Sequence, residues 1–176
     1  PENGAVIKSI VSTKMVKAIC EDYGVKLMDV LTGFKFIGEK IKQFEKDNSY
    51  TYLFGFEESH GYLSGTHARD KDGVNASMLI AEMTAYYKSK NMTLFDAMNS
   101  LYEKYGYYKE NVISATFEGL DGMDKIKNLM KNFKENPPKA IGSANVTEII
   151  NYNDGIDGLP KADVLRFELD DDTTIF

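Results

Sequence analysis

Strand-like and helix-like segments alternate through the first 56 residues, and this alternation limits the possible folds more than any other feature of the chain. The runs 5–11, 25–31 and 51–56 are apolar and rich in β-branched or aromatic residues, as buried strands are. Between them, apolar residues over 15–20 and 37–44 repeat at helical spacing. Such alternation indicates a parallel sheet with right-handed crossovers. We therefore predict an α/β fold, a three-layer α/β/α domain with a mostly parallel, four-stranded mixed sheet.

Further helices and one more strand are predicted beyond this part. The stretch 57–73 is long and polar and is predicted to be a loop, with a helix starting near Val74. Thr93 and Asp121 are good N-cap residues, so helices are expected to follow them. The β-branched run 112–117 is expected to supply the remaining strand.

The character of the chain changes at Asn136-Pro137-Pro138, because proline cannot continue a helix. We predict that residues 1–138 form the α/β/α domain. Residues 139–176 would be a short β-rich tail, the truncated start of a second domain. The chain starts without Met and ends in strand-like residues, so we expect it to be a piece of a longer protein.

Composition excludes several classes of partner. The net charge is −6 and no stripe of Lys or Arg is present, which argues against nucleic acid. No apolar run approaches the ~20 residues that a membrane span needs. The single cysteine, Cys20, excludes an internal disulfide and favours a cytoplasmic setting. Because it lies in an apolar helical stripe, we expect Cys20 to be buried.

The densest polar cluster follows the third predicted strand. Glu57, Glu58 and Ser59 stand there, and Gly61 follows. Carboxylates accept hydrogen bonds from sugar hydroxyls, and charge-assisted bonds are strong, so this loop is suited to reading a polyol. The glycine lets backbone approach a ligand closely. The plainer interpretation is that both carboxylates are solvated loop charges.

Two further segments could meet a polar ligand. Arg69 and Lys71 precede a predicted helix, where a phosphate would meet both cations and the helix dipole. The alternative is a surface charge run in which Asp72 caps the helix. The turn at Thr32 and Gly33 ends the second strand, on the same side of a parallel sheet as Glu57. The alternative there is an ordinary turn with Thr32 as N-cap.

Other sites are not supported. The histidines His60 and His67 lack the spacing or cysteine partners of a zinc site. The run 151–155 is similar to part of a calcium loop, but Ala162 stands where the bidentate Glu belongs. There is no dinucleotide fingerprint, P-loop or nucleophile elbow. We therefore predict no metal site and no catalytic residue in this chain.

Three of these segments together resemble the third domain of the α-D-phosphohexomutases, the phosphoglucomutase/phosphomannomutase family. They are LTGFKFIG at 31–38, GFEESHGY at 55–62 and RDKDG at 69–73. The resemblance continues through 105–107, and the tail at 158–169 resembles the lead-in to the family's fourth domain. The second segment is closest to the phosphoglucomutase/phosphopentomutase branch.

The resemblance implies roles for individual residues. Glu57 and Ser59 would bind sugar hydroxyls, and Thr32 and Gly33 would form the other sugar-side turn. Lys71, together with Arg69, would contact phosphate or hydroxyl groups. The expected ligand is a hexose phosphate, glucose 1-phosphate or glucose 6-phosphate.

The resemblance also implies what the chain lacks. Members of the family interconvert hexose 1-phosphate and hexose 6-phosphate through a phosphoserine, with magnesium held by an Asp-x-Asp-x-Asp-Arg loop. Neither loop occurs here, nor does the phosphate-binding loop of the Arg-Pro-Ser-Gly-Thr-Glu-Pro type. We expect the chain to orient the sugar for a magnesium-dependent parent enzyme, to bind no cofactor itself, and to need the parent's missing domains for turnover.

Three other interpretations remain open at this point. The chain could be a free-standing binding module for a phosphorylated metabolite. It could be a structural or interaction domain whose polar loop is inert. It could also be a different Rossmann-like enzyme, although the missing glycine fingerprint counts against that.

Overall fold

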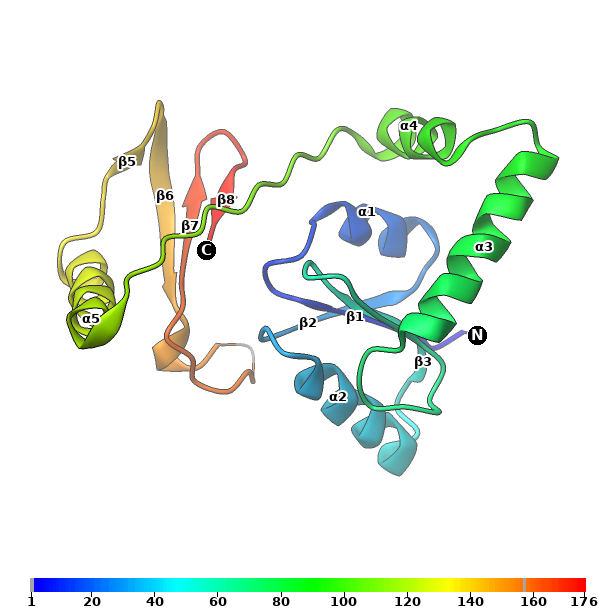
Figure 1. Ribbon diagram of the computed structural model, residues 1–176, viewed down its shortest axis with the longest axis horizontal. Helices are drawn as coiled ribbons and strands as arrows, with labels where there is room; N and C mark the ends of the chain where they lie inside the picture. The colour runs from blue at the N-terminus through cyan, green and yellow to red at the C-terminus, as the bar shows by residue number, and fades with distance from the viewer. Residues whose placement is uncertain (1, 157) are drawn as a thin grey trace. The chain divides into compact units, whose positions relative to one another are not determined.

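The structure is a computed structural model that describes residues 2–156 and 158–176. It divides the chain into two compact units, Pro1–Glu110 and Asn111–Phe176, each of which is described by itself (Figure 1). Helix α5 (Gly119–Glu135) belongs to the second unit, whereas our division into domains, 1–138 and 139–176, places it in the first. As a statement about domains, that division stays a prediction.

A mixed, mostly parallel sheet of four strands forms the centre of the first unit, as predicted. The strand order is β2-β1-β3-β4. Strand β1 pairs in parallel with both β2 and β3, while β4 runs antiparallel to β3. The strands are β1 (Gly4–Ser9), β2 (Lys26–Val30), β3 (Thr51–Glu57) and β4 (Gly61–Ser64).

The fourth strand is not the one that we predicted. Strand β4 lies inside the stretch 57–73, which was expected to be a loop. The run 112–117 forms no strand, and Val112 and Ile113 are 75% and 91% exposed. The prediction was wrong because β-branched residues favour extended backbone, whereas a strand also needs a partner for its hydrogen-bond ladder.

The helices that follow β1 and β2 cover opposite faces of this sheet. Figure 1 shows α1 (Met15–Asp22) on one side and α2 (Phe34–Asp47) on the other. The predicted apolar stripe of α2 is buried completely: Ile37 and Ile41 are 0% exposed and Phe44 is 4% exposed. Cys20 of α1 is buried too, as expected, and burial raises the pKa of its thiol.

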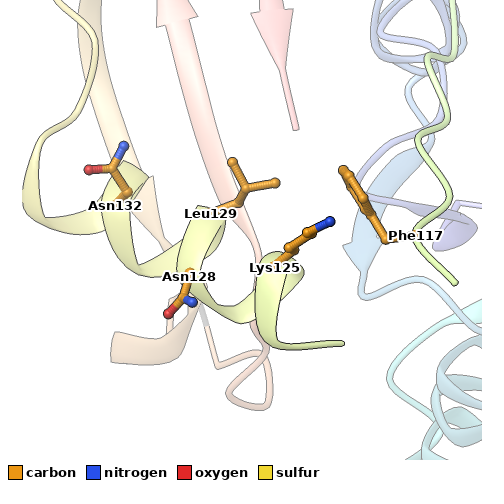
Figure 2. Close-up of a pocket in the computed structure, with 5 residues that line it drawn as sticks. All are labelled: Phe117, Lys125, Asn128, Leu129 and Asn132. Carbon is orange, nitrogen blue, oxygen red and sulfur yellow. The ribbon is translucent and has the colours of Figure 1, made fainter. Parts of the chain in front are cut away.

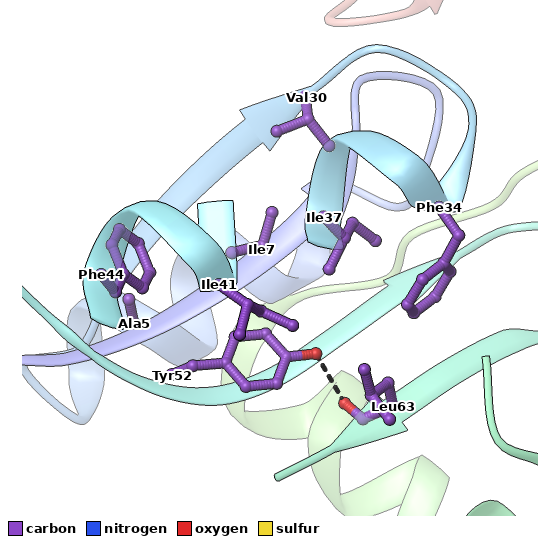
Figure 3. Packing of buried hydrophobic residues seen from close by; sticks show 9 residues of the cluster. All are labelled: Ala5, Ile7, Val30, Phe34, Ile37, Ile41, Phe44, Tyr52 and Leu63. Carbon is purple, nitrogen blue, oxygen red and sulfur yellow. Dashed lines mark hydrogen bonds between the residues drawn. The ribbon is translucent and has the colours of Figure 1, made fainter. Parts of the chain in front are cut away.

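The core between α2 and the sheet is apolar except for one phenol. The Tyr52 hydroxyl donates a hydrogen bond to the carbonyl oxygen of Leu63 at 2.8 Å, which ties β3 to β4 from within (Figure 3). Burial raises the pKa of Tyr52, so the hydroxyl stays a donor. The buried members of this cluster are Ala5, Ile7, Val30, Phe34, Ile37, Ile41, Phe44, Tyr52 and Leu63.

Two helices complete the first unit, α3 (Gly73–Ser89) and α4 (Leu94–Tyr105). Thr93 and Asp96 form the predicted capping box at the start of α4. The apolar faces of both helices are largely uncovered. Helix α3 has no buried residue, and only Ala97 of α4 is buried.

The second unit is α5 beside an antiparallel sheet of four short strands in the order β5-β6-β7-β8. The β-rich tail is thus confirmed. Phe133 of α5 meets Phe167 edge-on, with ring centroids 6.3 Å apart. Helix α5 begins after Glu118, so Asp121 lies in its first turn and is not its cap. Acidic residues are favoured at both places, which is why the sequence did not separate them. The remaining elements are β5 (Ala140–Ile141), β6 (Ala144–Asn151), η1 (Tyr152–Asp154), β7 (Leu165–Leu169) and β8 (Thr174–Ile175).

Candidate functional site

The candidate site lies at the carboxyl ends of the three parallel strands, β2, β1 and β3. Parallel strands bring their carboxyl ends to one edge of the sheet, where α/β proteins bind ligands. Ser9 ends β1, the turn at Thr32 and Gly33 follows β2, and Glu57 ends β3. Segments that are up to 49 residues apart therefore meet at this edge.

Glu57 joins the two predicted sugar-side segments. Its carboxylate atom Oε1 accepts a hydrogen bond from the backbone N–H of Gly33 at 2.5 Å. The side chain of Glu57 is only 5% exposed. The backbone of Gly33 has φ 123° and ψ 117°, a conformation that glycine adopts readily and other residues rarely adopt. Among the described residues, none donates a hydrogen bond to the other carboxylate atom, Oε2.

Gly61 marks the point where Lys71, Phe34 and Glu57 converge. A Cβ atom at Gly61 would stand 3.2 Å from Lys71 Cδ, 3.3 Å from Phe34 Cδ2 and 3.4 Å from Glu57 Oε2. The Lys71 ammonium lies 5.7 Å from the centre of the Phe34 ring. Its hydrogen bond to Asp70, with a smaller contribution from the charge of Glu57, raises the pKa of Lys71. The Lys71 side chain and the Glu57 carboxylate therefore lie next to each other, on either side of Gly61.

Arg69 is engaged elsewhere. Its guanidinium donates to both carboxylate oxygens of Glu45 on α2, at 2.5 and 2.6 Å, and to the carbonyl of Thr66 at 2.6 Å. The structure therefore groups Lys71, and not Arg69, with Glu57. A role for Arg69 in binding phosphate stays a prediction.

The two predicted hydroxyl groups are accessible. Thr32 and Ser59 are both exposed, while Glu57 is buried beside them. Thr32 is not the N-cap of α2, as one interpretation had it, because Gly33 takes that place without a side-chain cap. His60, next to Ser59, has φ 60°, so the turn between β3 and β4 is left-handed at that residue.

A partly buried polar network behind this edge was missed by the sequence analysis. It links Lys8 and Ser9 of β1, Ser12, Asp29 of β2 and Glu58. The signal was present in the sequence: Lys8 is a charge inside an otherwise apolar strand. Periodicity alone does not show that such a charge has partners.

A hollow in the second unit does not belong to this site. It lies beside α5, measures about 440 Å³, and combines Phe117 and Leu129 with a few polar side chains (Figure 2). None of the predicted site residues lines it. Over residues 2–156 and 158–176, no three His, Cys, Asp or Glu side chains gather closely enough to hold a metal ion. Within the same ranges, no helix has the length and apolar character to cross a membrane.

Comparison with known proteins decides the family. The model of the domain described as "Phosphoglucomutase/phosphomannomutase, alpha/beta/alpha domain III" matches residues 1–105. The chain belongs to this family. The resemblance drawn from the three loop segments is thereby confirmed, and the loop residues of the site all lie within the matched range.

Among the curated relatives, a phosphoglucomutase of Staphylococcus aureus strain N315 is 39% identical over 147 residues, covering 84% of this chain and 26% of that protein. A phosphoglucomutase of Staphylococcus saprophyticus is 34% identical over 173 residues, covering 92% of this chain and 31% of that protein. The chain thus spans about a quarter to a third of the length of these relatives.

A solved structure shares the fold. It is the open form of parafusin, a phosphoglucomutase of Paramecium, with a TM-score of 0.62 and 20% identity. The match covers 97% of this chain and 29% of that one. Because the identity is low, this likeness supports the family fold and adds nothing about ligands.

Proposed function

We propose that the chain is the sugar-recognition part of a phosphoglucomutase-type enzyme that interconverts hexose 1-phosphate and hexose 6-phosphate. The observation that carries the proposal is the convergence of Glu57, Gly33 and Lys71 at the carboxyl edge of the sheet, in a chain of this family.

Glu57 would bind sugar hydroxyls through Oε2. The backbone N–H of Gly33 already holds Oε1, so the carboxylate is oriented before a ligand arrives. A hydroxyl that donates to an ionised, oriented carboxylate forms a charge-assisted bond worth roughly 1.5–3 kcal/mol. The exposed hydroxyls of Ser59 and Thr32 supply donors and acceptors to neighbouring sugar positions.

Lys71 would meet the phosphate. Its ammonium stays charged, it is exposed, and it stands one residue before Asp72, the N-cap of α3. The N-terminus of a helix adds a favourable field for an anion. Arg69 would reach the same phosphate only by releasing Glu45.

The chemical step belongs to parts of the longer enzyme that these 176 residues do not include. Phosphoryl transfer needs an in-line donor and charge neutralisation, which magnesium and a phosphoserine supply in this family. The described residues offer no fitting magnesium site. What they can do is hold the sugar in one orientation, with the hexose phosphate and the remaining domains as partners. A cytoplasmic setting stays a prediction.

A chemical-shift titration of the chain with glucose 1-phosphate and glucose 6-phosphate tests the binding role. We expect shifts confined to 32–35, 57–61 and 69–71. Glu57→Ala should abolish them, whereas the exposed Glu82→Ala, on α3, should leave them unchanged. Shifts that Glu57→Ala leaves intact would overturn the role of Glu57.

Kinetics of the longer enzyme test the orienting role. Glu57→Ala should raise KM and also lower kcat, because orienting interactions act in the transition state. Unchanged kinetics would remove Glu57 from the site. Turnover of glucose 1-phosphate by the 176-residue chain alone would refute the assignment of the chemistry to other domains.

A further inference from the structure

The adjacent carboxylates Glu57 and Glu58 have different partners. Glu57 accepts from the backbone of Gly33. Glu58 instead accepts a hydrogen bond from the hydroxyl of Ser9, with Ser9 Oγ 2.7 Å from Glu58 Oε2. Ser12 Oγ lies 3.4 Å from the same oxygen. The second carboxylate therefore faces the end of β1 and not the turn that carries Gly33.

Ser9 and Ser12 form a hydrogen-bonded pair behind Glu58. Their hydroxyl oxygens are 2.7 Å apart, and the two residues are only 0% and 5% exposed. A hydroxyl has one proton to donate. Since Ser9 donates to Glu58, Ser12 donates to Ser9, and the bonds form a chain that ends on a carboxylate. Such chains are strengthened by the terminal charge.

Lys8 holds this serine pair in place. Its ammonium donates to the carbonyl oxygens of both Ser9 and Ser12, each at 3.1 Å, and lies 3.1 Å from Asp29 Oδ1. Lys8 is 4% exposed and its two bonds to the serine carbonyls are buried, so losing either partner is costly, whereas Asp29 is 49% exposed. The network thus connects the ends of β2 and β1 to the turn after β3.

We propose that Glu58 is a positioning residue that fastens the turn 58–60 to the end of β1, so that its neighbour Glu57 is held against Gly33. The inference rests on the proposed function in one respect only, namely that the carboxylate of Glu57 binds a sugar. Two adjacent and chemically identical side chains would then have different roles. Glu57 contacts the ligand, while Glu58 acts through Ser9 on the geometry of Glu57.

Amide hydrogen exchange in the 176-residue chain tests this without a ligand. The reporter is the Gly33 N–H, whose acceptor is Glu57. Glu58→Ala should accelerate its exchange about tenfold, the effect of losing one partly buried charge-assisted bond on a local opening. Ser9→Ala removes the donor without adding bulk and should act in the same direction. Glu82→Ala, at an exposed position on α3, is the matched control.

Glu58→Gln separates positioning from general stability. Glutamine keeps an oxygen acceptor for Ser9, so exchange at Gly33 should return to within about threefold of the wild-type rate. Amides of Ile7 and Ile41 in the core should change less than about twofold in every variant. Equal acceleration of core and turn would show a merely structural role and overturn the proposal, as would an unchanged Gly33 rate in both alanine variants.

A titration of the same variants with glucose 6-phosphate distinguishes failure of the proposed function from failure of the positioning role of Glu58. Absence of glucose 6-phosphate shifts in the wild-type chain, with unaltered kinetics of Glu57→Ala in the longer enzyme, would count against the proposed function alone. The exchange rates at Gly33 would still decide whether Glu58 positions Glu57.

Discussion

The carboxylate of Glu57 accepts a hydrogen bond from the backbone N–H of Gly33 at 2.5 Å. This bond joins the end of β3 to the turn after β2 across the intervening strand β1. The two residues are 24 positions apart in the chain, and each was assigned to the sugar-binding face on separate grounds. Because the two residues are paired, a change in the turn at Gly33 should alter the position of the Glu57 carboxylate.

Gly33→Ala should destabilise the first unit. The backbone there has φ 123° and ψ 117°, which an L residue adopts only at a cost of about 1–3 kcal/mol. The measurement is a urea titration followed at resolved amides of the first unit, because the chain has two compact units that need not unfold together. Gly73→Ala is the matched control: nothing lies within 4 Å and its φ is not positive, so a small gain in stability is expected. Equal midpoints for the two variants would contradict the strain argument.

Gly61→Ala should displace Lys71 from Phe34. The added methyl group would stand 3.2 Å from Lys71 Cδ and 3.3 Å from Phe34 Cδ2. Because the lysine stem is flexible and the ring is packed in the core, the lysine should move, at a cost of about 1 kcal/mol. Ring-current shifts of the Lys71 methylene protons report the move. Lys35, whose ammonium is 4.9 Å from the Phe36 ring, is the internal control. Unaltered Lys71 shifts would show that the space around Gly61 accommodates a methyl group without moving the lysine.

The parallel part of the fold could be predicted because its signals are local and redundant. Each buried strand is an apolar run, and α2 repeats Ile37, Ile41 and Phe44 on one face, all of which are buried. Strand β4 gave no comparable signal. It has four residues, Gly61–Ser64, and its turn uses a left-handed His60 where a glycine or asparagine would have marked a hairpin.

Periodicity predicts an apolar face, but not what covers it. Helix α3 forms where a helix was predicted, yet its apolar residues Val74 and Met78 are 83% and 59% exposed. The same limit applies to the candidate site, where the sequence indicates single residues but not their contacts. Glu57 could be placed at a strand end from the sequence, whereas its bond to Gly33 depends on the order β2-β1-β3, which is settled only in three dimensions. The Lys8 network was missed for the same reason.

Glu45→Gln should free Arg69 for a phosphate. The pair is half-exposed, with side chains 43% and 47% accessible, so breaking it should cost less than about 1 kcal/mol of stability. If Arg69 binds phosphate, the variant should bind glucose 6-phosphate about two- to fivefold more tightly, because an exposed ion pair of this strength no longer competes. Glu39→Gln, exposed on the same helix, is the control. Unchanged affinity in both variants would leave Lys71 as the phosphate contact and remove Arg69.

The start of α3 should loosen in acid because of Asp72. The N–H of Asn75, then His67, hydrogen-bonds its carboxylate and lowers the pKa of Asp72. A carboxylate whose folded pKa is depressed stabilises the fold above the unfolded pKa, about 3.9. That contribution is lost as pH falls through the folded value.

The comparison of wild type with Asp72→Asn isolates this effect, because other carboxylates with lowered pKa values, including Asp22, Asp47 and Asp96, titrate equally in both proteins. Asparagine still caps a helix but carries no charge. Exchange protection of the Ala76 N–H, which bonds the Asp72 carbonyl, is the readout. Wild type should be better protected near pH 6, and the two proteins should converge only as the pH falls below the depressed pKa of Asp72, where both side chains are neutral. Parallel protection curves across that range would show that the charge of Asp72 adds nothing to the cap, and the start of α3 would then be stabilised by the hydrogen bonds of the cap alone.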